Sequence, residues 1–256
     1  MNSTNQKPLI LITNDDGDTA KGIEVLARLM LQLGDVVVVS PDGQRSGQSN
    51  ALTVGHPLRY RKIQEQEGLV WYTSTGTPTD CVKLALNEIV DRKPDLLVAG
   101  VNHGSNAAIN VVYSGTMGAV IEGCVNGINS IGFSILDHSP NADFSNMESY
   151  ILKITHKVLA NGLPAGVCLN VNSPIDNIKG IKITSQCTGK WIKEYEKRTD
   201  PHGRPYFWLT GHFQNEEPEN KETDEWVLAQ GYVSIVPTKI DLTDYDLMDE
   251  LKKWEF

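Results

Sequence analysis

Short apolar runs and amphipathic segments alternate along the first two thirds of the chain. The first run, Leu9–Thr13, leads into the polar residues 14–17 and is typical of a buried strand that enters a loop. The second run, 36–39, consists of valines and ends at the turn residues 40–43. Further runs of strand length are predicted at 70–73, 96–99 and 131–136.

Helical patterns separate these runs. Residues 22–33 carry apolar side chains at helical spacing, and Gly34 suits the end of a helix. A second helix is predicted to begin with Thr77 as its N-cap and Pro78 at its first position, and a third covers 116–126. This alternation predicts an α/β fold with a mainly parallel sheet covered by helices on both faces. In such sheets, ligands bind at the carboxyl ends of the strands.

The pattern changes after about residue 166. Strands are predicted at 168–172, 181–185 and 231–237, and the segment 241–256 is expected to be partly helical. Between them, residues 191–226 are rich in aromatic, charged and turn residues, which favours a hairpin extension over a second catalytic domain. We therefore expect a single domain over 1–256. Its core spans about 8–190, its hairpin extension about 191–228, and its last strand and tail about 229–256.

Composition narrows the function. The chain has 256 residues and a net charge of −9, so it lacks the basic field of a protein that wraps nucleic acid, although a small phosphorylated ligand remains compatible. Its four cysteines are widely spaced and are expected to be reduced and mostly buried. The polar start, Met1 to Pro8, and the shortness of every apolar run predict no signal core, no membrane span and a cytoplasmic location.

The sequence Asn14-Asp15-Asp16-Gly17 is the first candidate for chemistry. Two successive carboxylates at the end of a strand repel each other, and desolvation is costly unless a cation lies beside them. Oxygen ligands of this kind suit Mg²⁺, Mn²⁺ or Ca²⁺, although the spacing does not match a calcium-binding EF-hand loop. The alternative is an acidic turn that caps a helix.

Three further loops carry small polar side chains. Residues 45–50 and 100–106 offer hydroxyl and amide oxygens among glycines, and Asn102 follows a buried strand directly. Ser114 and its neighbours at the start of a predicted helix form a candidate anion site. Each loop can also be an ordinary polar turn, with Ser114 only a helix cap. His103 is a candidate general acid or base, but in this oxygen-rich loop we expect it to face solvent and to take no part in the chemistry.

Several common enzyme motifs are missing from the sequence. No G-x-S-x-G nucleophile elbow, no G-x-x-x-x-G-K-[ST] loop and no G-x-G-x-x-G after the first strand is present. The sequence therefore gives no motif evidence for a serine hydrolase, a nucleoside-triphosphate-binding protein or a dinucleotide-binding enzyme.

Taken together, the loops resemble those of the SurE family of nucleotidases. The matching stretches are ILITNDDG at 10–17, SPDGQRSGQSN at 40–50, GTPTDCV at 76–82, GVNHGSN at 100–106 and YSGT at 113–116, with later echoes at 169–172, 199–206, 231–235 and 241–243. The resemblance covers nearly the whole chain in family order. The sequence departs from the family pattern in its C-terminal part, in SIVPT at 234–238 and in residues 215–222, which are predicted to be a divergent hairpin tip.

The resemblance implies a Rossmann-like core, a projecting hairpin and a C-terminal segment that builds homodimers or homotetramers. It implies one divalent cation per subunit, Mg²⁺ or Mn²⁺, and hydrolysis of nucleoside 5′-monophosphates, of 3′-monophosphates and of short polyphosphate. The implied metal ligands are Asp15, Asp16, Ser46 and Asn102, and the implied phosphate or substrate ligands are Asn50, Asn106, Ser114, Gly115 and Thr116. Asp15, Asp16 and Asn106 are the expected catalytic residues.

Two rival functions remain open on the sequence. One is a nucleotide-binding regulator that keeps the metal and phosphate loops without turnover. The other is a nicotinamide-dependent enzyme on the same frame, which the missing glycine fingerprint disfavours.

Overall fold

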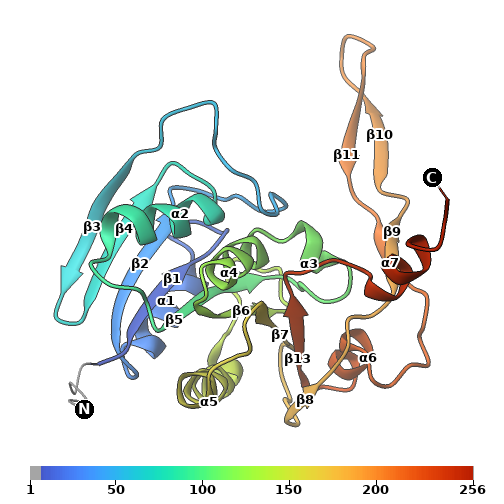
Figure 1. The fold of residues 1–256 in the computed structure, drawn as a ribbon. Helices are drawn as coiled ribbons and strands as arrows, with labels where there is room; N and C mark the ends of the chain where they lie inside the picture. Colours follow the sequence, from blue (N-terminus) through green and yellow to red (C-terminus); the bar gives the residue numbers. More distant parts are fainter. Residues whose placement is uncertain (1–6, 256) are drawn as a thin grey trace.

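The computed structural model describes residues 7–255, so most of the polar start and the last residue lie outside the described part. Within this range the main sheet has nine strands in the order β3-β4-β2-β1-β5-β6-β7-β13-β8 (Figure 1). Their bounds are β1 Leu9–Thr13, β2 Asp35–Pro41, β3 Tyr60–Gln66, β4 Leu69–Ser74, β5 Leu96–His103, β6 Asn129–Ile135, β7 Val167–Ser173, β8 Ile181–Ile183 and β13 Val233–Lys239.

The centre of the sheet is parallel, as predicted. The neighbouring pairs from β4 through β2, β1, β5 and β6 to β7 all run in the same direction, while β3 and β13 pair antiparallel with β4 and β7. Strand β1 contributes side chains to the apolar clusters on both faces of the sheet, because successive side chains of a strand point to opposite sides. Ile10 and Ile12 belong to one buried apolar cluster and Leu11 to the other.

Helices cover both faces of the sheet, which confirms the predicted fold class. The helices α1 (Lys21–Met30) and α5 (Ser145–Asn161) pack on one face, and α2 (Pro78–Leu84) and α4 (Gly115–Val125) pack on the other. The predicted start of α2 is correct: the Thr77 hydroxyl accepts the backbone N–H of Asp80, whose side chain accepts the N–H of Thr77. A single π-helical turn, Ala85–Ile89, extends α2.

The strand order reverses beside β1. From β1 the chain builds outward to β2 and β4, then crosses back to place β5 on the other side of β1. Ligands of open α/β sheets bind in the crevice at such a point. The loops after β1 and β5, which carry the predicted Asp15, Asp16 and Asn102, therefore lie next to each other.

A two-part ribbon projects from the core near the C-terminal half (Figure 1). Its base is β9 (Gly189–Ile192) paired with β12 (His212–Asn215), and its outer part is β10 (Tyr195–Thr199) paired with β11 (Pro205–Leu209). The tip is the turn at 200–204, so the prediction of a tip at 215–222 is wrong. Asp200 accepts backbone N–H groups of His202 and Arg204 and closes that turn, whereas 216–223 connects β12 to the core.

Strand β3 and helix α5 were not predicted. Strand β3 is an edge strand in which every residue is exposed, so it has no apolar alternation to reveal it. Helix α5 has a readable signal, because Met147, Ile151, Ile154 and Val158 are buried at helical spacing. No helix was predicted over these residues.

Three further short helices lie in the described part of the chain. A short helix α3 (Asn110–Tyr113) precedes α4, helix α6 (Asp224–Ala229) lies inside the predicted hairpin extension and packs against β13, and α7 (Tyr245–Leu251) provides the expected helical tail. All four cysteines are buried and free, as predicted. In the described part of the chain, every helix is too short or too polar to span a bilayer.

Candidate active site

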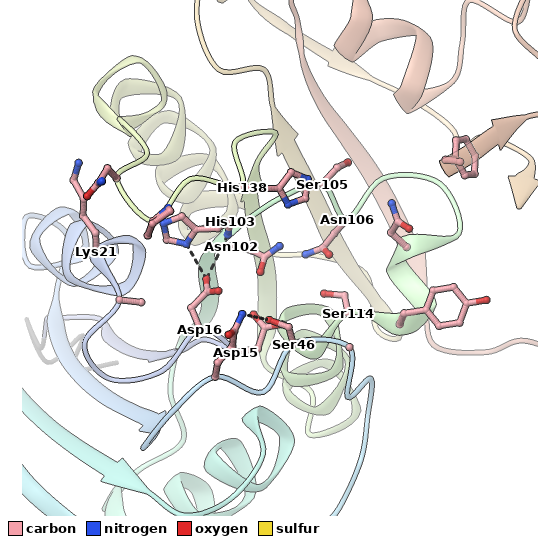
Figure 2. A pocket seen from close by; sticks show the side chains of 18 of the residues that line it. Asp15, Asp16, Lys21, Ser46, Asn102, His103, Ser105, Asn106, Ser114 and His138 are labelled. Carbon is pink, nitrogen blue, oxygen red and sulfur yellow. Dashed lines mark hydrogen bonds and ion pairs between the residues drawn. The ribbon is translucent and has the colours of Figure 1, made fainter. Parts of the chain in front are cut away.

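One large cleft opens at the carboxyl ends of β1 and β5. Its volume is about 1030 Å³, and its walls come from four loops of the core and from the base of the ribbon. Of the predicted residues, Asp15, Asp16, Ser46, Asn102, Asn106 and Ser114 all line it (Figure 2). The structure thus brings together side chains that lie up to 99 residues apart, since Asp15 and Ser114 face the same space.

The turn after β1 is held by its own polar and glycine residues. Asn14 donates its side-chain amide to the carbonyl of Gly17 at 2.9 Å. Gly17 has a φ of +101°, and a Cβ there would lie 3.0 Å from the backbone of Gly43. A larger residue therefore does not fit, and this turn sends the two intervening aspartates toward the cleft.

Asp15 is only 3% exposed and sits against the start of α4. The hydroxyl of Thr116 donates to Asp15 Oδ1 at 2.6 Å. Gly115 lets the helix approach this closely, because a Cβ at that position would lie 2.9 Å from the Cβ of Asp15. Burial, and to a smaller degree the charge of Asp16, raises the pKa of Asp15 to about 6, against the opposing effect of the Thr116 hydrogen bond.

Asp16 pairs with His103, which the sequence analysis treated as a solvent-facing bystander. That prediction is wrong: His103 Nδ1 lies 3.0 Å from Asp16 Oδ2, and both side chains are nearly buried. The ring also packs edge-on against Phe144, with centroids 5.3 Å apart. Figure 2 shows Asp16 pointing toward the His103 side chain. The sequence of the loop could not predict this contact between His103 and Phe144, because the two residues lie 41 positions apart in the chain.

Ser46 and Asn102 add neutral oxygen atoms to the same wall. The side-chain N–H of Asn102 donates to the carbonyl of Gly104 at 2.8 Å, which fixes the amide and leaves its carbonyl oxygen available. The register between β5 and β6 shifts just before Asn102, at the end of the strand. Ser46 is exposed, and its hydroxyl accepts a hydrogen bond from Gln44 at 3.1 Å.

These four side chains fit a hard divalent cation. The described residues contain no group of three or more histidine, cysteine, aspartate or glutamate side chains arranged to hold a metal. The Asp15–Asp16 pair with the oxygens of Ser46 and Asn102 is instead an all-oxygen set of two carboxylates and two neutral groups, which suits Mg²⁺ or Mn²⁺. Among the residues described, neither aspartate forms an ion pair with a lysine or arginine. The pair therefore lacks a strong cationic partner.

Ser114 and Asn106 provide hydrogen-bond donors in the same cleft. Ser114 Oγ accepts the backbone N–H of Met117 at 3.0 Å as the N-cap of α4, which leaves its own O–H free to donate. Asn106 donates one amide hydrogen to Ser134 Oγ at 2.8 Å and keeps a second. The positive end of the α4 dipole and these donors are the kinds of group that bind anions in proteins.

A buried network that the sequence analysis did not identify holds Asn106 in place. Asn172 Oδ1 accepts the backbone N–H of Asn106, and Asn170 donates to its carbonyl, both at 2.8 Å. Asn172 also donates to Asn170 Oδ1 at 2.9 Å. The signal was present in the sequence: two asparagines alternate with apolar residues in a central strand, where a polar side chain needs a partner.

Three predicted phosphate ligands, Asn50, Gly115 and Thr116, are not among the residues that line the cleft. Thr116 is fully buried, and its hydroxyl is committed to Asp15, so it does not line the cleft. Asn50 is exposed and also lies outside the lining. Gly115 acts by its lack of a side chain, as the close approach to Asp15 requires.

Several lining residues were not predicted. They include Lys21 and His138 on one rim, and Tyr113, Trp191, Phe213 and Glu225 toward the ribbon. The ribbon residues are far from the motif loops in sequence, and only the aromatic richness of 191–226 could have suggested them.

Comparisons with known proteins agree on one family. The model of the family described as survival protein SurE matches residues 10–193. A protein of Phocaeicola vulgatus named 5′-nucleotidase SurE is 52% identical over 250 residues, which cover 97% of each chain. A protein of the same name from Bacteroides fragilis is 53% identical over 98% of this chain and 99% of its own. The crystal structure of the SurE protein from Aquifex aeolicus superposes with a TM-score of 0.82 at 38% identity, covering 96% and 98% of the two chains.

Asp15→Asn is expected to stabilise the metal-free protein at neutral pH. The folded-state pKa of about 6 lies above the unfolded value of 3.8, so folding favours the protonated form. The resulting penalty is absent at low pH, grows as pH rises from 3.8 to about 6, and reaches about 3 kcal/mol above that range. Urea denaturation in EDTA at pH 4 and pH 7.5 gives the free energies of unfolding from which this penalty is measured.

Asp18→Asn is the matched control, because it removes a carboxylate from the same turn but outside the cleft lining. We expect Asp15→Asn to raise the free energy of unfolding at pH 7.5 and to have little effect at pH 4, and Asp18→Asn to do neither. An Asp15→Asn variant that is equally stable or less stable than wild type at pH 7.5 would contradict the account of this carboxylate.

Proposed function

The chain belongs to the survival protein SurE family, and from this premise and the chemistry of the cleft we propose that it hydrolyses nucleoside 5′-monophosphates to nucleoside and phosphate. The relatives named 5′-nucleotidase SurE match along almost the full length of the chain, which supports this activity. The observation that carries the proposal is the buried Asp15 beside Asp16, in the same cleft as Ser114 at the N-terminus of α4.

The reaction requires a divalent cation in this proposal. The side chains of Asp15, Asp16, Ser46 and Asn102 would hold one Mg²⁺ or Mn²⁺ ion. Such an ion supplies positive charge that stabilises the phosphoryl oxygens and makes a neighbouring water more acidic. It also explains how two adjacent carboxylates are tolerated although both side chains are nearly buried.

The remaining steps belong to the chain itself. The free hydroxyl hydrogen of Ser114 and the second amide hydrogen of Asn106 donate to phosphoryl oxygens, and the N-terminus of α4 adds its dipole. Water attacks phosphorus as the bond between phosphorus and the 5′-oxygen breaks. Asp15, whose carboxylate Thr116 and Gly115 hold in place, accepts the proton of the water and returns it to the departing 5′-oxygen of the nucleoside. Thr116 thus acts by positioning Asp15.

A competing route is direct attack by the Asp15 carboxylate on phosphorus, which would leave an acyl phosphate on the enzyme. Hydroxylamine trapping distinguishes the two routes. Attack by water predicts no trapped hydroxamate at Asp15.

The phosphate-binding groups contact only phosphoryl oxygens in this arrangement. The proposal therefore extends to 3′-monophosphates and short polyphosphate as poorer substrates. The four buried free cysteines fit a reducing compartment, and we propose a cytoplasmic location on that ground.

Asp15→Asn and Asp16→Asn are each expected to lower kcat/KM for AMP by about 100-fold or more, as the loss of one preorganised electrostatic group does in other enzymes. EDTA should abolish wild-type activity, and Mn²⁺ or Mg²⁺ should restore it. Asp18→Asn should stay within about twofold of wild type, because Asp18 lies outside the cleft lining. Phosphate release from AMP measures all of these, and activity that survives both chelation and the two substitutions would refute the proposal.

We further propose that the protein is a homodimer or homotetramer assembled through its ribbon and C-terminal helix. Every residue of β10 and β11 is exposed, including Tyr195, Phe207 and Trp208, although a lone two-stranded ribbon is marginal in water. Helix α7 has seven residues and none of them is buried, which is too short to be stable without a partner.

Leu247→Asp is expected to lower the oligomeric state, because it places a charge on the half-exposed apolar face of α7. Light scattering coupled to size-exclusion chromatography measures the molar mass. Val54→Asp, in a loop where the side chain is 92% exposed, is the control and should leave the mass unchanged. A wild-type monomer, or an unchanged mass for Leu247→Asp, would rule out this assembly.

A further inference from the structure

The cleft continues past the phosphate position toward the base of the ribbon. Its volume of about 1030 Å³ is at the upper end for small-molecule sites and far exceeds the needs of one phosphate group. The catalytic account uses only the wall made by the core loops. The wall contributed by β9, β12 and α6 has no role in that account.

Two aromatic rings form this second wall. Trp191 and Phe213 lie directly opposite each other in the antiparallel β9–β12 pair, and both are partly buried. The ring of Phe213 lies over Gly189, where an added Cβ would come within 2.3 Å of the Phe213 Cζ atom. The glycine therefore creates the space that the ring occupies.

Hydrogen bonding fixes the orientation of the indole. Trp191 Nε1 donates to Asn110 Oδ1 at 2.7 Å, and Asn110 also lines the cleft. This bond joins the ribbon to α3, only a few residues before the Ser114 cap of α4. The aromatic wall is thus anchored to the same segment as the phosphate site.

A polar group adjoins the rings. Glu225, in the first turn of α6, lines the cleft with a partly buried side chain. Among the described residues its carboxylate has no hydrogen-bond donor, since only its backbone N–H is paired, with Asp224. A ligand with a flat apolar surface and hydrogen-bond donors at its edge matches this wall better than a purely apolar one.

We propose that the Trp191–Phe213 wall is the subsite for the nucleobase of the substrate, with the base stacked on these rings while its phosphate lies at Asp15 and Ser114. This inference rests on the proposed function and deepens it. Every nucleobase has a π-face, so stacking explains selection for nucleotides over other phosphate esters without requiring one particular base.

The sharpest test compares AMP with ribose 5-phosphate, which carries the same ester and sugar but no base. Trp191→Ala and Phe213→Ala are each expected to lower kcat/KM for AMP about tenfold, the usual scale for one lost stacking contact. Both should leave ribose 5-phosphate within about twofold of wild type. Trp191→Phe, which keeps an aromatic face, should retain most of the AMP activity.

Tyr60→Ala is the matched control. It removes a ring that is 44% exposed on β3, at the far edge of the sheet, and should change neither substrate. Equal losses for AMP and ribose 5-phosphate in the Trp191 and Phe213 variants, or no loss for either substrate, would overturn the assignment.

A binding measurement separates failure of this subsite from failure of the proposed function. Adenosine has no phosphate, and it should quench the tryptophan fluorescence of the wild type but not of Trp191→Phe. If the wild type hydrolyses no phosphate ester yet shows this quench, the proposed function fails and the base subsite stands. If adenosine causes no quench, or the same quench in Trp191→Phe, the base subsite fails whatever the activity.

Discussion

The carboxylates of Asp15 and Asp16 lie side by side where β1 ends, and within residues 7–255 neither is ion-paired with a lysine or arginine. If this pair of carboxylates were exposed to solvent, their repulsion would destabilise the folded protein only slightly. Here Asp15 is almost fully buried and Asp16 nearly so, and burial is what raises the pKa of Asp15. The protein therefore keeps an unfavourable arrangement of charge at one point of its fold, and a bound cation is the simplest way to balance it.

The scaffold around the pair is built for this arrangement. Gly17 permits the turn, Gly115 permits the approach of α4, and Thr116 donates to the buried carboxylate. His103 holds Asp16 from the opposite side. Because the parallel sheet reverses its order beside β1, the same crevice also receives the N-terminus of α4 and the Asn106 loop. Rigid elements thus place two carboxylates and several hydrogen-bond donors in one cleft.

The central sheet and the meeting of Asp15, Asp16 and Asn102 in one cleft could be predicted from the sequence because their signals are local. A strand of apolar residues followed by Asn-Asp-Asp-Gly, or by Gly-Val-Asn, is readable without any tertiary contact. The His103–Asp16 pair, the commitment of Thr116 to Asp15 and the aromatic wall at Trp191 depend on contacts between segments distant in sequence. Thr116 and Asn50 illustrate the limit: a polar residue in the right loop does not reveal which way its side chain points.

The most direct test of the account is a calorimetric titration of Mn²⁺ into metal-stripped protein, with the Asp15→Asn/Asp16→Asn double variant alongside. The account predicts saturable binding of one ion per chain in the wild type and no measurable binding in the double variant. Absence of binding in the folded wild type, or the same affinity in both proteins, would contradict the claim that this carboxylate pair exists to hold a cation.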